Sequence, residues 1–177
     1  GAPAVLGFLF KDLDANPLDY VEGGALNERR KEISEYIDAT NPNLNAFRAT
    51  GGKLISFVGT YDTLASSGAQ LDYYQSVLDR MGPQRVREFA RFYVIPATGH
   101  GLSGNNYRVN GLGEAIPVRP VPNGGVPRLD LLVDWVENGV PPPDNLVLTA
   151  GGRSMPLCEY PAYPHYHGGD PDSASSY

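Results

Sequence analysis

The chain has 177 residues, of which 41% are hydrophobic and 19% charged, a balance typical of one folded domain with its own core. Its net charge of −6 argues against a nucleic-acid-binding surface. No apolar run reaches the roughly 18 residues of a membrane-spanning helix. The single cysteine, Cys158, cannot form a disulfide within the chain, so cysteine usage leaves the redox compartment open.

The first part of the chain predicts a helix and then a strand. Residues 25–38 carry apolar side chains on one face at helical spacing and charged side chains on the other. One further helical turn is expected at 44–49. Residues 53–59 form a short, mostly apolar run, which is typical of a strand buried on both faces.

A second helix and a second strand follow. Residues 69–81 predict a helix that Gly82-Pro83 stops. The next strand lies within 86–95 and is clearest at 89–95. A strand, a helix and another strand in this order indicate a right-handed parallel crossover. The sequence therefore predicts an α/β fold with parallel strands and crossover helices.

The last part of the chain is richer in Gly and Pro. A long loop, of a kind that is usually functional or mobile, is expected over 101–127. Residues 128–138 predict an amphipathic helix, and 146–148 a short terminal strand. Residues 151–177 have too little aliphatic content for a core of their own. We therefore expect an irregular tail that packs on the main portion, residues 1–150.

Two side chains follow the predicted strands at the positions where chemistry is expected. Asp62 follows the first strand, and His100 follows the second, 38 residues later. In doubly wound sheets such loops meet at the carboxyl ends of neighbouring strands, where active sites lie. A carboxylate there can fix the tautomer of an imidazole, whose other nitrogen then deprotonates a hydroxyl. The alternative is that Asp62 serves a turn and that His100 is a structural loop histidine.

The sequence offers no matching nucleophile. The α/β-hydrolase elbow requires Gly-x-Ser-x-Gly, but segment 101–105 lacks the second glycine, segment 152–156 also fails, and Ser56 lies inside a predicted strand. In these enzymes the serine precedes the acid and the histidine. The sequence thus supplies the last two members of a triad and not the first.

The other candidate residues lie near the C-terminus. Cys158, His165 and His167 fit no structural zinc spacing, so we expect no metal site. Cys158 has no histidine nearby in a known pairing and is a poor candidate for a nucleophile. The glycine clusters lack the strand-to-helix context of a phosphate loop, so no cofactor is expected in this chain.

Several blocks of sequence resemble, in the same order, the tannase and feruloyl esterase family. The acid block is Gly59-Thr60-Tyr61-Asp62, and the histidine block is Pro96-Ala97-Thr98-Gly99-His100. The remaining blocks of this likeness are 38–48, 51–55, 72–74, 133–139 and 153–161. The ordered set extends over most of residues 38–170.

The resemblance implies the C-terminal part of an α/β-hydrolase fold that cleaves esters of phenolic acids or related aromatic esters. It implies that Asp62 is the acid and His100 the base of a serine triad. The serine, the oxyanion hole and most of the lid would lie in an N-terminal chain or segment of the same enzyme, which is the expected partner. The calcium site of the family would lie in that lid. A secreted or periplasmic setting is also implied, and no substrate-binding residue is assigned.

Two departures from the family pattern keep alternatives open. Gly101 stands where family members commonly carry a cysteine bonded to one beside the serine. Cys158 resembles a family cysteine that pairs with one near the C-terminus, and the chain reaches Tyr177 without it. One alternative is a non-catalytic binding module on a hydrolase scaffold. Another is an α/β-hydrolase for aliphatic esters or oligoesters, because acid and base do not encode substrate choice.

Overall fold

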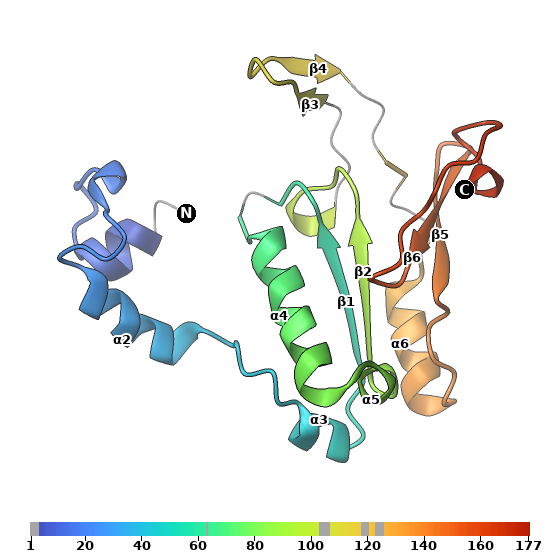
Figure 1. Cartoon of the computed structure of the whole chain (residues 1–177), viewed down its shortest axis with the longest axis horizontal. Coiled ribbons are helices and arrows are strands. Elements are labelled where there is room, and N and C mark those ends of the chain that lie inside the picture. Colours follow the sequence, from blue (N-terminus) through green and yellow to red (C-terminus); the bar gives the residue numbers. More distant parts are fainter. Residues whose placement is uncertain (1–3, 63, 103–106, 118–120, 123–125) are drawn as a thin grey trace. The chain divides into compact units, whose positions relative to one another are not determined.

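The computed structural model describes residues 4–62, 64–102, 107–117, 121–122 and 126–177. Contacts between Cα atoms divide the chain into two compact units, residues 1–41 and residues 42–177. Figure 1 shows the elements of both units in chain order. Each unit is described by itself. Within the described residues no helix has both the length and the apolar character needed to cross a membrane.

The N-terminal unit is helical. It contains a π-helical turn at Val5–Phe10, a 3-10 turn at Pro17–Asp19 and helix α2 at Asn27–Ile37. The predicted helix at 25–38 is therefore confirmed, but it begins and ends inside the predicted range, at Asn27 and Ile37. The expected apolar face is incomplete, because Ile37 is 64% exposed.

The second unit is built on a strand, a helix and a strand. Strand β1 (Leu54–Gly59), helix α4 (Ser67–Met81) and strand β2 (Ala90–Ile95) form the predicted crossover. The strands pair in parallel, from Leu54 opposite Ala90 to Gly59 opposite Ile95. The expected helical turn before β1 is present as α3 (Asn45–Ala49).

The second strand begins later than its widest predicted range. Residues Pro83–Arg87 form the short helix α5 instead, with Val86 buried in it. Proline favours the first turn of a helix because its φ is already helical and its missing N–H needs no partner there. The narrower prediction, a strand within 89–95, is confirmed.

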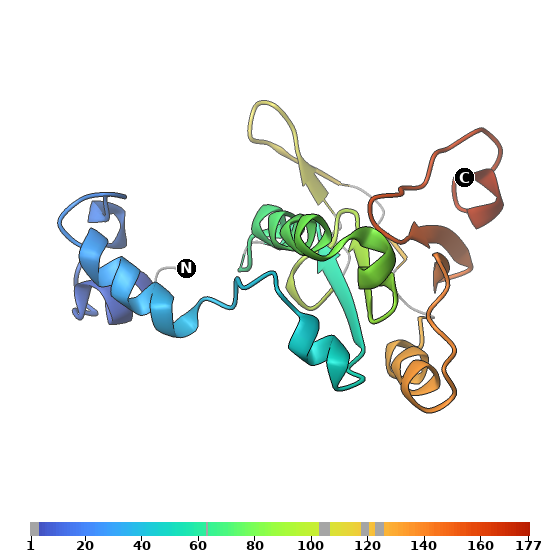
Figure 2. The same ribbon diagram turned by 60° about the horizontal axis from the view of Figure 1, so that its bottom comes forward.

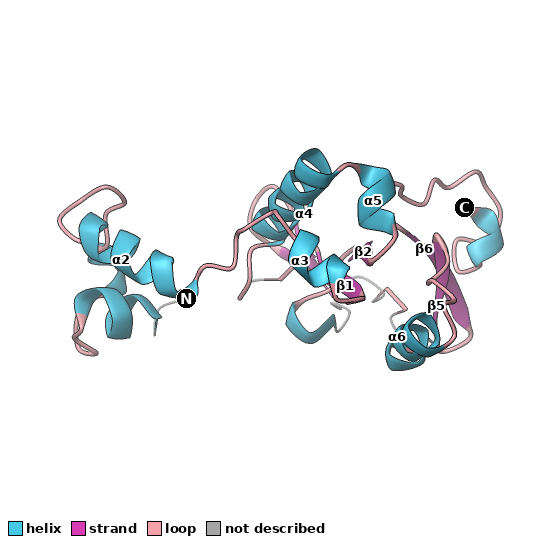
Figure 3. Cartoon of the chain, turned by 90° about the horizontal axis from the view of Figure 1, so that it is seen from below, coloured by secondary structure: helices cyan, strands magenta, loops and turns pink. Residues whose placement is uncertain are grey.

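Two apolar clusters lie on the two faces of the strand pair. Val58 and Phe92 pack with α4, and Tyr74 of that helix stacks on Phe92 with a centroid distance of 4.7 Å. Tyr93 and Ile95 belong to the other cluster. The two faces differ because successive side chains of a strand point in opposite directions. Figure 3 shows α4 and helix α6 (Arg128–Glu137) on opposite sides of the strands.

Helix α6 is anchored by one aromatic side chain. Trp135 is 4% exposed, and two cations contact its ring, with Lys53 Nζ at 5.2 Å and Arg91 Cζ at 4.9 Å from the centroid. Such cation–π contacts are worth about 0.5–2 kcal/mol each. Through Trp135 the helix therefore packs against the residues at the start of both β1 and β2.

The C-terminal part contains an antiparallel hairpin. Strand β5 (Asn145–Ala150) pairs with strand β6 (Arg153–Cys158). The prediction of an irregular tail is wrong over β6. Gly151 and Gly152 have positive φ angles of 56° and 77°, which suits a two-residue hairpin turn. Pro156 obscured this strand, because proline occurs in sheets mainly on edge strands. The division at residue 150 stays a prediction.

The long segment after His100 is not a continuous loop. It includes the short antiparallel strands β3 (Tyr107–Val109) and β4 (Ala115–Pro117). The turn between them is closed by the Asn110 carboxamide oxygen, which accepts from the N–H groups of Leu112 and Glu114 at 2.9 Å each. Figure 2 shows this hairpin projecting from the unit.

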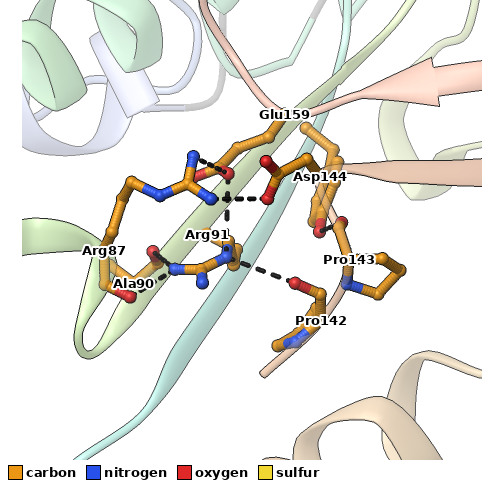
Figure 4. A network of polar contacts seen from close by, with 8 residues as sticks. Arg87, Ala90, Arg91, Pro142, Pro143, Asp144 and Glu159 are labelled. Atoms are coloured by element: carbon orange, nitrogen blue, oxygen red, sulfur yellow. Dashed lines mark hydrogen bonds and ion pairs between the residues drawn. The ribbon is translucent and has the colours of Figure 1, made fainter. Parts of the chain in front are cut away.

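A partly buried ionic network ties the C-terminal hairpin to β2 (Figure 4). Glu159 and Arg91 are each only 5% exposed, and their charged atoms lie 3.7 Å apart. Arg87 Nη1 lies 2.8 Å from Glu159 Oε2, and Arg87 Nη2 lies 2.5 Å from Asp144 Oδ1. Burial raises the pKa of Glu159, while Arg91 and Arg87 oppose that rise. Next to the network, Tyr160 N donates to Phe92 O at 2.8 Å, which joins the chain after β6 to β2.

Candidate active site

Asp62 lies three residues beyond β1, in a turn that its own carboxylate organises. Oδ1 accepts hydrogen bonds from the N–H groups of Leu64 and Ala65, both at 2.9 Å. The Asp62 N–H donates to Gly59 O at 3.2 Å. Aspartate favours such turns because its side chain can bond to the backbone two or three residues on. The turn bonds hold one carboxylate oxygen and leave Oδ2 for another partner.

That partner is His100, five residues beyond β2. Its Nδ1 lies 3.0 Å from Asp62 Oδ2. A carboxylate only accepts hydrogen bonds, so this contact assigns the proton to Nδ1 and leaves Nε2 with its lone pair. The Asp62 side chain is 9% exposed and the His100 side chain 59% exposed. Within the described residues the ring makes no second hydrogen bond. The carboxylate is therefore enclosed, while the imidazole remains accessible.

The electrostatics keep Asp62 ionised. The Ala65 N–H is the main cause that lowers the pKa of the carboxyl below its ordinary value of 3.8, and the hydrogen bond with His100 is the next. Both interactions favour the charged form, since each donates to the carboxylate. An ionised carboxylate on Nδ1–H stabilises an imidazolium. The pair can thus take up a proton at Nε2.

Hydrogen bonds between the two loops fix the pair. Thr60 N donates to Ile95 O at 3.1 Å, which continues the β1–β2 ladder past the strand ends. Tyr61 N donates to Thr98 O at 2.8 Å, and Ala97 N donates to the Thr60 hydroxyl at 2.9 Å. Each loop therefore both donates hydrogen bonds to the other and accepts them from it. The separation of acid and base is therefore set by backbone groups as well as by the side chains themselves.

The two segments are in close contact at Gly59 and Thr98. A Cβ on Gly59 would overlap the carbonyl oxygen and the hydroxyl of Thr98. Thr98 is fully buried, and its hydroxyl donates to Ile95 O at 3.0 Å. Glycine is needed here for close approach rather than for an unusual φ angle. Sequence reasoning did not assign this contact, although a glycine that ends a buried strand was the available signal.

The histidine loop has unusual backbone angles on both sides of His100. Ala97 and Leu102 have positive φ angles of 52° and 61°. Left-handed non-glycine residues cost about 1–3 kcal/mol each, and such strain clusters at functional sites. Gly101, at the position where the family pattern has a cysteine, has a φ of 77°, which glycine adopts without penalty.

An apolar cavity of about 290 Å³ lies beside the two loops. Thr60 and Pro96 contribute to its wall from the ends of β1 and β2, and Cys158 and Tyr160 contribute from the C-terminal part. Burial raises the pKa of the Cys158 thiol. Among the described residues Cys158 is a free thiol and forms no hydrogen bond with Asp62 or His100.

The remaining sequence candidates are not brought into this site. His165 and His167 lie near each other in the C-terminal part, with ring centroids 6.3 Å apart. Across the described ranges no group of three or more His, Cys, Asp or Glu side chains is placed to hold a metal ion. Most of the rejected serine motif at 101–105 falls outside the described residues. Ser154 instead accepts a backbone hydrogen bond from Ala174, at 2.9 Å.

A parallel strand–helix–strand unit with a hydrogen-bonded aspartate and histidine beyond its two strands defines part of an α/β-hydrolase fold. The family model described as tannase and feruloyl esterase matches residues 8–177. The chain belongs to this family.

Curated relatives agree with this membership. An uncharacterized esterase of Agrobacterium fabrum is 34% identical over 178 residues, which cover 96% of this chain and 29% of the relative. Feruloyl esterase B of Aspergillus niger is 36% identical over 136 residues, covering 74% of this chain and 26% of the relative. The chain thus spans about a quarter to a third of the length of these relatives.

Solved structures share the fold. Feruloyl esterase B from Aspergillus oryzae superposes with a TM-score of 0.74 at 24% identity, covering 98% of this chain and 35% of the other. The tannin acyl hydrolase from Aspergillus niger gives a TM-score of 0.66 at 28% identity, covering 95% of this chain and 31% of the other. The predicted partial α/β-hydrolase fold is therefore confirmed.

Proposed function

We propose that this chain is part of a serine carboxylic-ester hydrolase that cleaves esters of phenolic acids or related aromatic esters. In this proposal Asp62 is the acid and His100 the general base. The observation that carries it is the 3.0 Å contact between Asp62 Oδ2 and His100 Nδ1, with the ring otherwise accessible. Membership of the tannase and feruloyl esterase family supports the reaction class and the aromatic substrate.

The proposed chemistry follows from the two protonation sites of the imidazole. Nε2 takes the proton of a serine hydroxyl as that oxygen attacks the ester carbonyl, and Asp62 stabilises the imidazolium. The imidazolium then gives this proton to the leaving alcohol. A water molecule, deprotonated in the same way, attacks the acyl-enzyme and releases the acid. The ionised state of Asp62 supports the first step, because a carboxylate bound to Nδ1–H stabilises the imidazolium that forms.

The serine is assigned to another part of the same enzyme, here called the nucleophile-bearing segment. Within the described residues, no serine is hydrogen-bonded to the His100 ring. The relatives are three to four times longer than the matched part, which gives room for such a segment. We assign the oxyanion donors and the substrate lid to it as well. No cofactor is proposed for residues 1–177, and the calcium site of the family is assigned to the lid.

A secreted or periplasmic location is part of the same proposal. Its support is the resemblance to the tannase and feruloyl esterase family, which implies such a setting. An amidase or peptidase role has no supporting observation, whereas two alternatives keep some support. These are a non-catalytic scaffold, favoured by Gly101 in place of the tethering cysteine, and hydrolysis of aliphatic esters, since the substrate pocket is not defined by Asp62 and His100.

The test uses the intact protein that carries this chain. Hydrolysis of methyl ferulate and methyl gallate is compared with that of aliphatic methyl esters, and a fluorophosphonate probe reports an activated serine. We expect aromatic ester turnover and labelling outside residues 1–177. His100→Ala should lower kcat by about 10⁴-fold or more. His165→Ala, an exposed histidine in the C-terminal part, is the matched control and should leave kcat unchanged.

The outcomes distinguish the aromatic esterase from the two alternatives. Absence of both labelling and turnover would favour the non-catalytic scaffold. Labelling together with turnover of aliphatic esters alone would support the proposed acid and base, and it would show that the substrates are aliphatic and not aromatic esters. Equal turnover by wild type and His100→Ala would remove the proposed base.

A further inference from the structure

The turn before His100 contains an alanine in a conformation that alanine seldom adopts. Ala97 has a φ of 52° and follows Pro96. Because the proline ring fixes φ at about −65°, this order of angles is the pattern of a type II turn, which favours glycine after the proline. A residue with a Cβ is strained at that position, so the turn depends on support from outside.

The support comes from Thr60, which directly follows β1. Its hydroxyl oxygen accepts a hydrogen bond from the Ala97 N–H at 2.9 Å. In a type II turn the closing bond uses the N–H of the fourth residue, so the N–H of the third residue needs another acceptor. Figure 1 shows the ends of β1 and β2 side by side, which is the arrangement that brings this hydroxyl to Ala97.

The hydroxyl of Thr60 has a role that the backbone of the same residue cannot fill. Thr60 N donates to Ile95 O at 3.1 Å, a bond that any residue except proline can form. Acceptance of the Ala97 N–H, by contrast, requires a side-chain acceptor. The apolar cavity beside the two loops includes Leu71 and Val94 in its wall, and aliphatic side chains offer the Ala97 N–H no acceptor.

Both ends of this hydrogen bond lie close to the acid and the base in the sequence. Thr60 stands two residues before Asp62, and Ala97 stands three residues before His100. If Ala97 relaxed to a negative φ, the chain that leads to His100 would change direction. The imidazole would then move away from the carboxylate that it contacts at 3.0 Å. Small displacements of this kind are costly for catalytic groups.

We propose that Thr60 is a positioning residue for His100, because its hydroxyl holds the strained Ala97 turn and thereby keeps the imidazole Nδ1 on the Asp62 carboxylate. Thr60 acts through the backbone of Ala97 and not by contact with the ring. The proposal rests on the proposed function, in which His100 is the base. It also gives a physical reason why this turn can carry alanine after the proline.

Kinetics of the intact protein test the hydroxyl. Thr60→Val keeps the branched shape of the side chain and removes the acceptor. For the ester that the wild type hydrolyses fastest, kcat should fall by about tenfold and KM should stay within about twofold, since the base is displaced. Thr60→Ser keeps the hydroxyl and should retain kcat within about threefold. Thr149→Val, which removes an exposed hydroxyl from β5, is the matched control and should leave kcat unchanged.

A second substitution isolates the turn from any other role of Thr60. Ala97→Gly relieves the strain, because glycine adopts a positive φ without penalty. In the double variant Thr60→Val/Ala97→Gly the turn no longer depends on the hydroxyl, so kcat should return to within about threefold of the wild type. Glycine at position 97 would not repair a loss of packing at position 60, so recovery reports the turn itself.

Two NMR measurements report the same effect without turnover. The Ala97 amide should exchange with solvent about tenfold faster or more in Thr60→Val than in the wild type. The His100 Nδ1–H, identified as the downfield signal that His100→Ala removes, should be visible while Asp62 binds that proton. This signal should weaken in Thr60→Val and return in the double variant, because an imidazole N–H released to water exchanges rapidly.

Several results would overturn the proposal. They are wild-type kcat in Thr60→Val, an equal loss of kcat in Thr60→Ser, no recovery in the double variant, and an undisturbed Nδ1–H signal in a slow Thr60→Val variant. If the wild type hydrolyses no ester, the enzymatic role is refuted, and the two NMR measurements still decide whether Thr60 positions the histidine. The two failures are therefore distinguishable.

Discussion

Gly59 and Thr98 are in such close contact that no side chain can be added at Gly59 without displacing Thr98. Gly59 ends β1, and Thr98 lies two residues before His100. This contact brings together the backbone of the two loops that present Asp62 and His100. The geometry of the pair thus depends on Gly59, which forms no hydrogen bond with the side chain of Asp62 or His100.

Replacement of that glycine should disturb both folding and the site. We expect Gly59→Ala to destabilise the intact protein by about 1–3 kcal/mol, because the added methyl overpacks a buried contact. It should also lower kcat, since small displacements of catalytic groups are costly. Gly68→Ala is the control, because a Cβ there would meet only Ser66 Oγ at 3.7 Å. Thermal unfolding and ester hydrolysis check both effects, and equal behaviour of the two variants would contradict the proposed role of the contact.

The acid of the pair should be needed for the base to work. Asp62→Asn keeps the shape of the side chain but offers Nδ1–H no negative charge, and its amide can orient the wrong tautomer. We expect kcat to fall by about 10⁴-fold. Asp72→Asn, on the exposed surface of α4, should leave kcat within about twofold of wild type. A smaller loss in Asp62→Asn than in Asp72→Asn would show that the 3.0 Å contact has no part in turnover.

Asp62 should also contribute to stability in a pH-dependent manner. Its pKa is lowered in the folded protein, chiefly by the Ala65 N–H and then by His100. A carboxyl of this kind stabilises the fold above its ordinary pKa of 3.8 and loses that contribution as the pH falls through the lower, folded value. The Tm of the wild type should therefore decrease by more than the Tm of Asp62→Asn as the pH falls from 6 to about 2. Parallel losses of Tm in the two proteins would argue against the lowered pKa.

The buried ion pair between Arg91 and Glu159 should matter far more than a surface pair. Glu159→Gln leaves Arg91 charged at 5% exposure, and we expect a loss of about 3 kcal/mol in the free energy of unfolding. Glu88→Gln breaks the 2.6 Å pair with Arg48, whose side chains are 38% and 54% exposed. That control should cost about 0–1 kcal/mol. Denaturant unfolding compares them. A loss in Glu159→Gln as small as that in the control would indicate that the carbonyl oxygens of Pro142 and Ala90, which accept from Arg91 at 3.4 and 3.0 Å, satisfy the guanidinium without Glu159.

Cys158 should react slowly with thiol reagents. Burial raises the pKa of its thiol above the ordinary 9.0, so less thiolate is present at neutral pH. Alkylation by iodoacetamide at pH 7.5 should be at least about tenfold slower in the native intact protein than after unfolding. Mass spectrometry of the labelled peptide measures this. Rapid native labelling would contradict the burial, and protection that persists after unfolding without reductant would reveal a disulfide.

Much of the central fold could be predicted from local patterns. The apolar run at 53–59, the helical periodicity at 69–81 and the strand ending at Ile95 each reflect short-range chemistry. Strand β6 was missed because Pro156 contradicts a strand on local grounds, and only its partner β5 makes the pairing favourable. Helix α5 was missed because Pro83 can either end one helix or begin the next.

For the site, the sequence by itself determined which residues are available. It placed one aspartate and one histidine directly after two apolar strands, and it placed Gly59 at a strand end. Tertiary structure alone decided that these side chains meet at 3.0 Å, that Thr60 and Thr98 tie their loops together, and that the Arg128 guanidinium lies over Phe57. The reason is physical. Residue type and periodicity fix local conformation, whereas contacts across 38 or 71 residues depend on strand register and packing, which no local pattern encodes.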